Sequence, residues 1–421
     1  MIRVLWFSNT PALGNQMLSK ESKIKGTGGW MGALNEIMKD QVDLHIVFHY
    51  PYKKESFKHK NTYYYPVYTG NIFFRLIKNR IYTDVPDDKC LDSYLKIINE
   101  VKPDIIHIHG TENSFLCILE QTNIPTVVSI QGNLTVYNHK FYSGFNGKFL
   151  NRKKYASLKE FAIDPKYFKK SKSTLSKMAQ IEQRRMKDIK YVFGRTDWDY
   201  RITRILSPNS KYFKGEELLR EAFYTRKWNN LYQNEGNLIV FTTNSDNYYK
   251  GIETVFHSIT LLQEIGIDIE WRIAGIKDDS LIVSICKSFL GSSFPKSGYK
   301  LLGSLDGESL VQQLLASHMY VMPSHIENSP NNLCEAMILG MPCIATFAGG
   351  TGSILKDGEE GILIQDGDPW AMSGAVVEII NDCNKALTFG NNARKRALTR
   401  HDKEFVSEQY VRDYRNILNL T

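Results

Sequence analysis

Two glutamates, Glu327 and Glu335, lie on either side of a Ser-Pro-Asn-Asn turn, and the apolar residues that follow have the spacing of a buried helix. The first N–H groups of a helix have no partner within it and attract anions. A diphosphate could bind the backbone here, with Glu335 accepting hydrogen bonds from a ribose diol and Glu327 facing the reacting part of the ligand. The backbone concerned is that of Ser329, Pro330, Asn331, Asn332 and Leu333.

A simpler interpretation of the same stretch is also open. Asn332 is a good N-cap residue, and Glu335 three positions later completes a capping-box pattern. Gly340 and Pro342 would then close the helix. This interpretation gives Glu335 about 1 kcal/mol of helix stabilisation and leaves Glu327 as a residue of the loop surface.

Lys250 is the second candidate for chemistry. It follows the apolar run "LIVFTT" after a short polar stretch and stands before Gly251, at the head of a predicted helix. A lysine held at the head of a helix can bind phosphate groups as a cation. The alternative is an ordinary surface lysine before a turn glycine.

The elements that must position these residues alternate in both halves of the chain. Short apolar runs such as "IRVLWF", "DIIHIHG" and "TVVSI", then "LIVFTT", "WRIAG" and "MYVMPS", are separated by helical stretches. A polar segment, "NNLYQNEGN", links the two series and predicts two Rossmann-like domains with parallel sheets.

Ligands of open α/β sheets bind beyond the carboxyl ends of the strands, so residues just after strands are the informative ones. Besides the segment from Ser324 to Glu335, these are Gly28, Gly29, His107, His109, Gln131 and Gly275. Strand alternation places His107 and His109 on one face. We expect His109 to reach a ligand and His107 to be a buried, satisfied histidine.

The composition of the chain disfavours several classes of protein. The 421 residues contain no apolar run near the roughly 18 residues of a membrane span, and the apolar start reads as a first strand and not as a signal peptide. The six cysteines form no CxxC pair, which favours reduced core thiols in a cytoplasmic protein over disulfides or a zinc site.

The net charge of +8 is concentrated in one segment. Residues 140–190 hold fifteen Lys/Arg and four Asp/Glu, a net +11, so the remainder carries about −3. With interleaved Phe and Tyr, this block could face an anionic membrane or an acidic substrate, with peripheral attachment at the inner face of the cell membrane. A solvated surface is equally open, and no nucleic-acid-binding motif accompanies the block. The aromatics expected at the headgroups are Phe141, Tyr142, Phe145, Phe149, Tyr167 and Phe168.

The stretch "PSHIENSPNNLCEAMILGMPCIAT" resembles the E-x7-E signature of retaining glycosyltransferase family 4. "GTGGW", "YKGIETVFHSI", "LLGSL", "FAGG" and "FVSEQYVRDYRNIL" extend the resemblance over most of the chain, and "GRTDWD" resembles a subgroup from bacterial surface-polysaccharide and capsular pathways. The resemblance implies an α/β GT-B fold, with two facing Rossmann-like domains, a deep interdomain cleft and a C-terminal helix that crosses back to the first domain. The expected limits are 1–225 with 403–421 for an acceptor domain, and 237–402 for a nucleotide-sugar domain.

The resemblance also implies a role for each matching residue. Glu335 would bind the ribose, Lys250 the leaving phosphates and Glu327 the transferred sugar. Gly28 and Gly29 would let the backbone approach the diphosphate, and Leu302 in "LLGSL" would flank the base, near Gly275. His109 and Gln131 complete the candidate catalytic set.

Two positions depart from the family pattern. Ser245 stands where the family usually has an arginine five residues before the lysine, so one phosphate cation is missing or comes from elsewhere. Gln131 stands where a histidine is frequent; it can hydrogen-bond a sugar but cannot titrate.

We therefore expect a retaining, metal-independent enzyme that moves a sugar from a nucleotide-sugar, by family frequency a UDP-sugar, to a saccharide or lipid-linked acceptor, with no cofactor. The alternatives are a sugar-nucleotide epimerase of the same fold, a metal-dependent GT-A transferase using "DWD" or "DGD", and a non-catalytic membrane- or polyanion-binding module. "DGD" is better explained by Asp368 capping a helix that begins at Pro369. No G-x-G-x-x-G follows the first strand of either half, which disfavours a NAD dehydrogenase.

Overall fold

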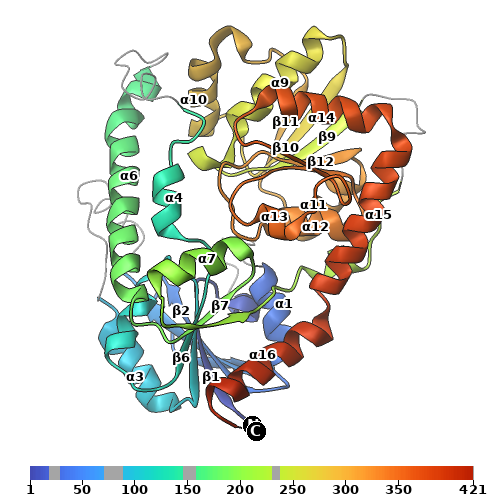
Figure 1. The fold of residues 1–421 in the computed structure, drawn as a ribbon. Coiled ribbons are helices and arrows are strands. Elements are labelled where there is room, and N and C mark those ends of the chain that lie inside the picture. The colour runs from blue at the N-terminus through green and yellow to red at the C-terminus, as the bar shows by residue number, and fades with distance from the viewer. Residues whose placement is uncertain (19–28, 71–88, 146–157, 230–237, 421) are drawn as a thin grey trace. The chain divides into compact units, whose positions relative to one another are not determined.

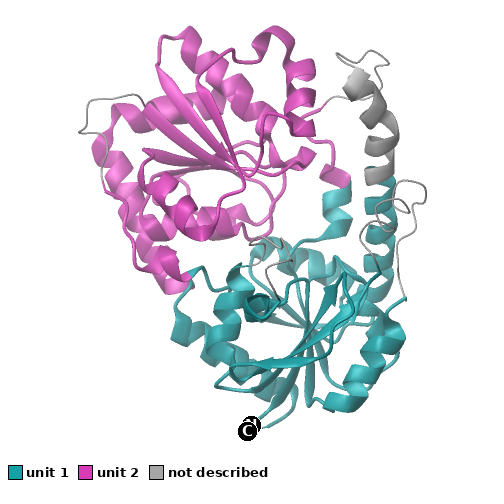
Figure 2. Cartoon of the chain, turned by 180° about the vertical axis from the view of Figure 1, so that it is seen from behind, with its two compact units in different colours: residues 1–138, 169–220, 401–421 teal, residues 139–168, 221–400 magenta. Residues whose placement is uncertain are grey.

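The computed structural model describes residues 1–18, 29–70, 89–145, 158–229 and 238–420. For residues 158–171 it describes the backbone only. The chain forms two compact units, each built around its own sheet. Unit 1 comprises 1–138, 169–220 and 401–421, and unit 2 comprises 139–168 and 221–400 (Figure 2).

Unit 1 is built on an eight-stranded sheet in the order β3-β4-β2-β1-β5-β6-β7-β8, in which only the β3–β4 pair is antiparallel (Figure 1). The central strands are buried on both faces, as parallel strands covered by helices must be. Alternation along β1 sends Val4 and Trp6 to one core cluster and Leu5 and Phe7 to the other. The strands are β1 (Arg3–Ser8), β2 (Asp43–Tyr50), β3 (Phe57–His59), β4 (Thr62–Tyr68), β5 (Ile105–His109), β6 (Thr126–Ser129), β7 (Tyr191–Gly194) and β8 (Lys211–Lys214).

The helices of unit 1 include the last helix of the chain. Tyr410 and Tyr414 of that helix lie in the same buried cluster as Trp6. The helical elements are η1 (Ala12–Gln16), α1 (Gly29–Met38), α3 (Leu91–Val101), η2 (Ser114–Glu120), α4 (Leu134–Lys140), α6 (Leu158–Met186), α7 (Asp197–Leu206) and α16 (Lys403–Ile417); α4 and α6 each run across a unit boundary.

Unit 2 has a six-stranded, all-parallel sheet in the order β11-β10-β9-β12-β13-β14. This is the doubly wound strand order, which reverses direction between its first and fourth strands, here β9 and β12. The strands are β9 (Leu238–Thr243), β10 (Ile269–Ala274), β11 (Tyr299–Gly303), β12 (Met319–Met322), β13 (Cys343–Thr346) and β14 (Ile362–Ile364).

Helices cover both faces of the second sheet. In Figure 1, α9, α10 and α14 lie on one side of the strands, and α11, α12 and α13 on the other. The prediction for Asp368 is confirmed, because its side chain accepts the N–H of Ala371 and Pro369 is the first helical residue. The elements are α8 (Glu221–Tyr224), η3 (Tyr248–Lys250), α9 (Ile252–Glu264), α10 (Leu281–Leu290), η4 (Gly291–Ser293), α11 (Gly307–Leu315), α12 (Asn331–Leu339), α13 (Thr351–Ile354), α14 (Pro369–Asn381) and α15 (Cys383–Arg400).

The unit boundaries differ from the expected domain limits. Unit 1 stops at 220 and resumes at 401, where 225 and 403 were expected. The basic segment was expected in the first domain, whereas its part from 140 to 168 groups with unit 2. The expected linker is 229–237, and from 230 onward it lies outside the described residues. Among the cysteines, Cys383 is exposed and is not a core residue.

The aromatic side chains near the start of the basic segment are not where a membrane-binding surface needs them. Phe141 and Phe145 are buried, at 7% and 6% exposure. Both rings pack against Tyr248, with centroid distances of 5.4 and 5.9 Å, and Phe145 also packs against Phe289. The expectation that these two residues enter lipid headgroups is wrong, because packing within unit 2 already removes their apolar surface from water. Phe149, Tyr167 and Phe168 lie outside the described side chains.

No helix in the described part of the chain is both long and apolar enough to cross a membrane.

Candidate functional site

The strand order of unit 2 brings Lys250 and Glu327 together. Lys250 ends η3 after β9, Glu327 follows β12, and these strands are neighbours at the point where the order reverses. Lys250 Nζ lies 2.5 Å from Glu327 Oε1, which also accepts the hydroxyl of Ser324 at 2.8 Å. Two residues that are 77 positions apart in sequence thus form one ion pair.

Two glycines allow the two loops to approach. Gly251 has a φ of +68°, and a Cβ there would clash with the carbonyl oxygen of Pro323. Gly349 has a φ of +58°, and a Cβ there would clash with the carbonyl of Glu327, which also accepts the N–H of Gly350 at 2.9 Å. Only glycine adopts these conformations at such short range without strain.

The ion pair is largely buried but still reaches solvent. The side chain of Lys250 is 24% exposed and that of Glu327 is 11% exposed. Burial by itself would lower the pKa of Lys250, but the Glu327 carboxylate more than offsets it, so the pKa of the lysine is raised. Lys250 is therefore a permanent cation at neutral pH, with a face left toward solvent.

Glu335 is 3% exposed and lies on α12. The helix begins at Asn331 after Pro330, no side chain caps it, and Glu335 is its fifth residue. The capping-box interpretation is wrong, because Asn332 is inside the helix and cannot act as its N-cap. Burial raises the pKa of the Tyr320 phenol, and the charges of Glu327 and Glu335 add to the rise.

The start of α12 has the features expected of an anion site. Ser329 and Asn331 are half-buried, Asn332 is exposed, and Pro330 and Leu333 are buried. The side-chain oxygen of Asn331 is buried and has no hydrogen-bond partner among the residues described. Because amide oxygen and nitrogen are assigned by their surroundings, this side chain could equally present its NH₂ group to an anion.

The other predicted residues of unit 2 also lie at strand ends. Gly275 follows β10, and its backbone lies against that of Asn244 after β9. Leu302 is half-buried in β11. Ser245, at the position of the missing arginine, receives a hydrogen bond from Asn247 at 3.0 Å.

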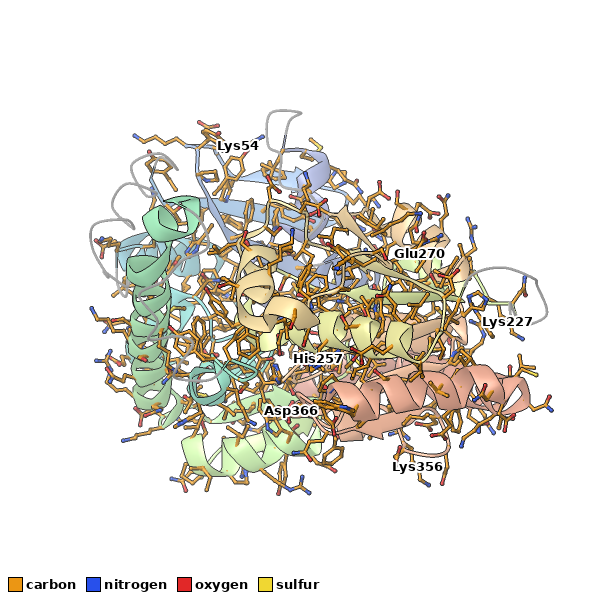
Figure 3. The ribbon with its side chains drawn as sticks, turned by 90° about the horizontal axis from the view of Figure 1, so that it is seen from above. Lys54, Lys227, His257, Glu270, Lys356 and Asp366 are labelled. Atoms are coloured by element: carbon orange, nitrogen blue, oxygen red, sulfur yellow. The ribbon has the colours of Figure 1, made fainter. Side chains whose placement is uncertain are left out.

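A charged cluster beside the ion pair was missed by sequence reasoning. His325 is 2% exposed and lies between two carboxylates, with Nε2 2.5 Å from Glu253 Oε1 and Nδ1 3.2 Å from Asp366 Oδ2. Asp366 is labelled in Figure 3. Burial would lower the pKa of His325, but the hydrogen bonds and charges of Asp366 and Glu253 raise it to about 9. In the sequence, His325 is visible only as the histidine of "SHIE", inside the motif that contains Glu327.

Of the two histidines of β5, His107 has the predicted environment, whereas His109 is buried and does not reach the surface. His107 is fully buried and satisfied, with Tyr414 Oη and Ser129 Oγ each 2.6 Å from a ring nitrogen, as predicted. His109 is also fully buried, stacked on His107 at 3.9 Å, and neither of its nitrogens has a partner in the described structure. Burial lowers the pKa of His109 to about 3, so it is a neutral group.

The remaining predicted residues of unit 1 are Gln131, Gly29 and Gly28. Gln131 is half-buried just after β6. Gly29 begins α1 beside the side chain of Arg220, and Gly28 lies outside the described residues.

Three of the acidic residues in the two Asp-x-Asp tripeptides have structural partners. Asp199 completes the capping box of α7 with Thr196. Asp366 holds His325, and Asp368 caps α14. Where the structure is described, no group of three or more His, Cys, Asp or Glu side chains could hold a metal ion.

Comparison with known proteins agrees with this geometry. Residues 226–396 match the family described as glycosyl transferases group 1. The chain is 23% identical over 318 residues to the putative teichuronic acid biosynthesis glycosyltransferase of Bacillus subtilis, which covers 74% of this chain and 70% of that one. It is 30% identical over 101 residues to the capsular polysaccharide biosynthesis glycosyltransferase of Staphylococcus aureus, spanning 24% of this chain and only 27% of that protein.

Solved structures share the whole fold at low identity. Sucrose-phosphate synthase from Thermosynechococcus elongatus matches with a TM-score of 0.75 and 15% identity over the full length of both chains. The Anabaena protein HepE, solved with UDP and glucose, matches with a TM-score of 0.64 and 14% identity over 99% of this chain and all of that one. The chain therefore has the GT-B fold, and its second unit carries a glycosyl transferases group 1 domain.

Proposed function

We propose that this chain, with a glycosyl transferases group 1 domain on a GT-B fold, is a retaining, metal-independent glycosyltransferase that uses a nucleotide-sugar donor. The observation that carries the proposal is the pairing of Lys250 with Glu327 at 2.5 Å, at the point where the strand order of unit 2 reverses. Both residues match the family motif, and the doubly wound sheet is of the type that binds ligands at this position.

Each residue of the site acts on a different part of the donor during bond cleavage. When the bond between the sugar and the diphosphate breaks, negative charge grows on the leaving phosphates. Lys250 and the first backbone N–H groups of α12, those of Asn331 and Asn332, stabilise that charge, which is greater in the transition state than in the bound donor. Glu335, buried on α12, accepts hydrogen bonds from the ribose hydroxyls.

Glu327 has two functions in this proposal. Its Oε1 fixes the position of the lysine ammonium, and its carboxylate faces the sugar that is transferred. A UDP-sugar is our preferred donor, in line with the complex of HepE with UDP-glucose. The cation that would take the place of the family arginine at Ser245 is not assigned.

A panel of nucleotide-sugars tests this proposal. The purified protein is incubated with UDP-, GDP-, ADP- and CMP-sugars, and slow donor hydrolysis is followed by release of the free nucleotide. We expect turnover with a UDP-sugar, unchanged by EDTA, and strong loss in Lys250→Met. Turnover that EDTA abolishes would refute metal independence, and no binding or hydrolysis of any nucleotide-sugar would refute the function.

The acceptor is proposed to be a lipid-linked saccharide at an anionic membrane surface. Support comes from the +11 charge of residues 140–190 and from relatives whose names place them in capsular and teichuronic acid biosynthesis. Phe141 and Phe145 are buried and are not part of this surface. Flotation with phosphatidylglycerol vesicles should show binding at low salt that disappears as salt rises; absence of binding at low salt would refute membrane attachment.

A further inference from the structure

Two glutamates of unit 1, Glu112 and Glu182, differ in how their oxygens are satisfied. Glu182 of α6 is 1% exposed and accepts four hydrogen bonds. Its Oε1 accepts from Thr111 Oγ1 at 2.5 Å and Leu134 N at 3.1 Å, and its Oε2 from Thr135 N at 2.7 Å and Thr135 Oγ1 at 2.6 Å. These contacts give Glu182 a complete structural explanation: it holds the loops after β5 and β6 together.

Glu112 lies in the loop after β5 and is only half satisfied. Its Oε1 accepts the backbone N–H of Gly132 at 3.0 Å. Its Oε2 is buried and has no hydrogen-bond partner among the side chains and backbone that the structure describes. A buried polar atom without a partner destabilises the folded state, so its presence calls for an explanation other than stability.

The backbone is shaped to admit this carboxyl group. Gly110 has a φ of +94°, and a Cβ there would clash with Glu112 Oε2 and lie 3.4 Å from Gln131 Oε1. The two side chains therefore converge over one glycine at the carboxyl ends of β5 and β6. β5 is also the strand next to β1, where the order of this sheet reverses, so the position is one where α/β sheets bind ligands.

The carboxyl group can change its protonation state near neutral pH. Burial raises the pKa of Glu112 to about 7; the neighbouring Glu182 adds to the rise, and backbone hydrogen bonds and the charge of Arg195 oppose it. Because the N–H of Gly132 points at Oε1, the proton of the acid form belongs on Oε2. The unpaired oxygen is thus a hydrogen-bond acceptor above pH 7 and a hydroxyl below it.

We propose that Glu112 Oε2, with the Gln131 amide beside it, binds a hydroxyl group of the acceptor saccharide. The inference rests on the proposed function, in which the residues of unit 2 bind the donor and a separate site must hold the acceptor. An uncharged O–H donor suits the unpaired oxygen, whereas a phosphate would be repelled by the two carboxylates. Glu112 is half-buried as a whole, so a small rotation of its side chain meets a hydroxyl at the surface.

The test compares Glu112→Gln with the matched control Glu182→Gln, using the best acceptor from a panel of nitrophenyl hexosides and N-acetylhexosaminides. In Glu112→Gln the amide oxygen keeps the bond to Gly132 and its NH₂ replaces Oε2, so the hydroxyl loses its acceptor. We expect the acceptor KM to rise at least tenfold, with donor affinity unchanged and the melting temperature equal or higher. Glu182→Gln places an NH₂ group against the hydrogen-bond donors that Glu182 accepts, so it should lower the melting temperature and serves as the control for loss of structure.

A pH series adds a measurement that a purely structural role would not affect. The wild-type acceptor KM should rise as the pH falls through about 7, and that of Glu112→Gln should not vary there. A wild-type KM and pH profile in Glu112→Gln, or a melting temperature that falls as in Glu182→Gln, would overturn the inference. Donor hydrolysis by the wild type tests the proposed function separately: if donor is hydrolysed normally and only the Glu112 result is negative, the inference alone fails.

Discussion

At the scale of single residues, the two glutamates of the E-x7-E motif occupy different environments. Glu327 is bound by Lys250 and Ser324, whereas Glu335 is buried within α12 and takes no part in capping it. In the proposed function, Glu327 acts through the cation of Lys250, and Glu335 accepts hydrogen bonds from the ribose hydroxyls.

Glu335→Gln tests the ribose role. A neutral amide accepts hydrogen bonds more weakly than a carboxylate, and charge-assisted bonds contribute about 1.5–3 kcal/mol, so UDP affinity should fall at least tenfold. Isothermal titration calorimetry with UDP measures this loss. Glu359→Gln, which changes an exposed carboxylate of unit 2, is the control. An unchanged UDP affinity in Glu335→Gln would exclude the role.

Lys250→Met should act on both stability and turnover. It leaves Glu327 largely buried without its cation, and should lower the free energy of unfolding by about 1–3 kcal/mol in urea titrations. Adding Glu327→Gln should restore much of that stability, because no unpaired charge remains. Donor turnover should stay low in the double variant, since the phosphate cation is still missing. Recovery of turnover along with stability would show that Lys250 is only structural.

At the scale of elements, His325 joins the parts that carry the ion pair. Its ring binds Glu253 in the first turn of α9 and Asp366 after β14, and its backbone N–H donates to Tyr249 at 2.8 Å. Lys140 lies 4.0 Å from Asp366, and Gly144 fits closely against the Glu253–His325 pair. The loop that presents Glu327 is therefore fixed to three other segments of unit 2.

The contacts of His325 with Glu253 and Asp366 predict that the stability of the protein depends on pH. The pKa of His325 is raised from its ordinary 6.5 to about 9, so its contribution is complete below about pH 6.5 and is lost as the pH rises toward 9. We expect the wild-type free energy of unfolding to fall by roughly 2–3 kcal/mol over this range from this group. His325→Gln should be less stable at pH 6.5 and should show a flatter profile. Parallel profiles for the two proteins would contradict the prediction.

At the scale of the whole molecule, each unit is assembled from distant parts of the chain. Unit 2 includes 139–168, and unit 1 is completed by α16 at the end of the sequence. Tyr414 of α16 accepts the indole N–H of Trp6 at 3.1 Å and lies 2.6 Å from His107 Nδ1. The first strand, a central strand and the last helix therefore share one buried hydroxyl.

Tyr414→Phe should destabilise unit 1 without touching the candidate site of unit 2. Removing the hydroxyl leaves Trp6 and His107 with unpaired buried groups, and should lower the free energy of unfolding by about 1–3 kcal/mol while UDP affinity stays the same. Denaturant unfolding followed by tryptophan fluorescence measures the loss. Phe405→Ala changes an exposed residue of the same helix and should fall within about 0.5 kcal/mol of the wild type.

Local patterns were enough to predict the two parallel α/β units, the strand-end positions of Lys250 and Glu327, and the cap at Asp368. Strand periodicity and turn chemistry act over a few residues, so they can be read without a fold. The same local rules misjudged the start of α12, because a capping box and a motif that ends at Glu335 look alike in sequence.

Only the tertiary structure decided which distant side chains meet. The Lys250–Glu327 pair, the cluster around His325 and the position of the Glu112 carboxyl group depend on strand order and loop approach across 20 to 77 positions of sequence. Phe141 and Phe145 are buried in the tertiary structure, and no local sequence pattern specifies whether such residues are exposed. The reason is physical: a residue's type sets what it can bind, but its solvation and its partners are set by segments that fold against it from elsewhere in the chain.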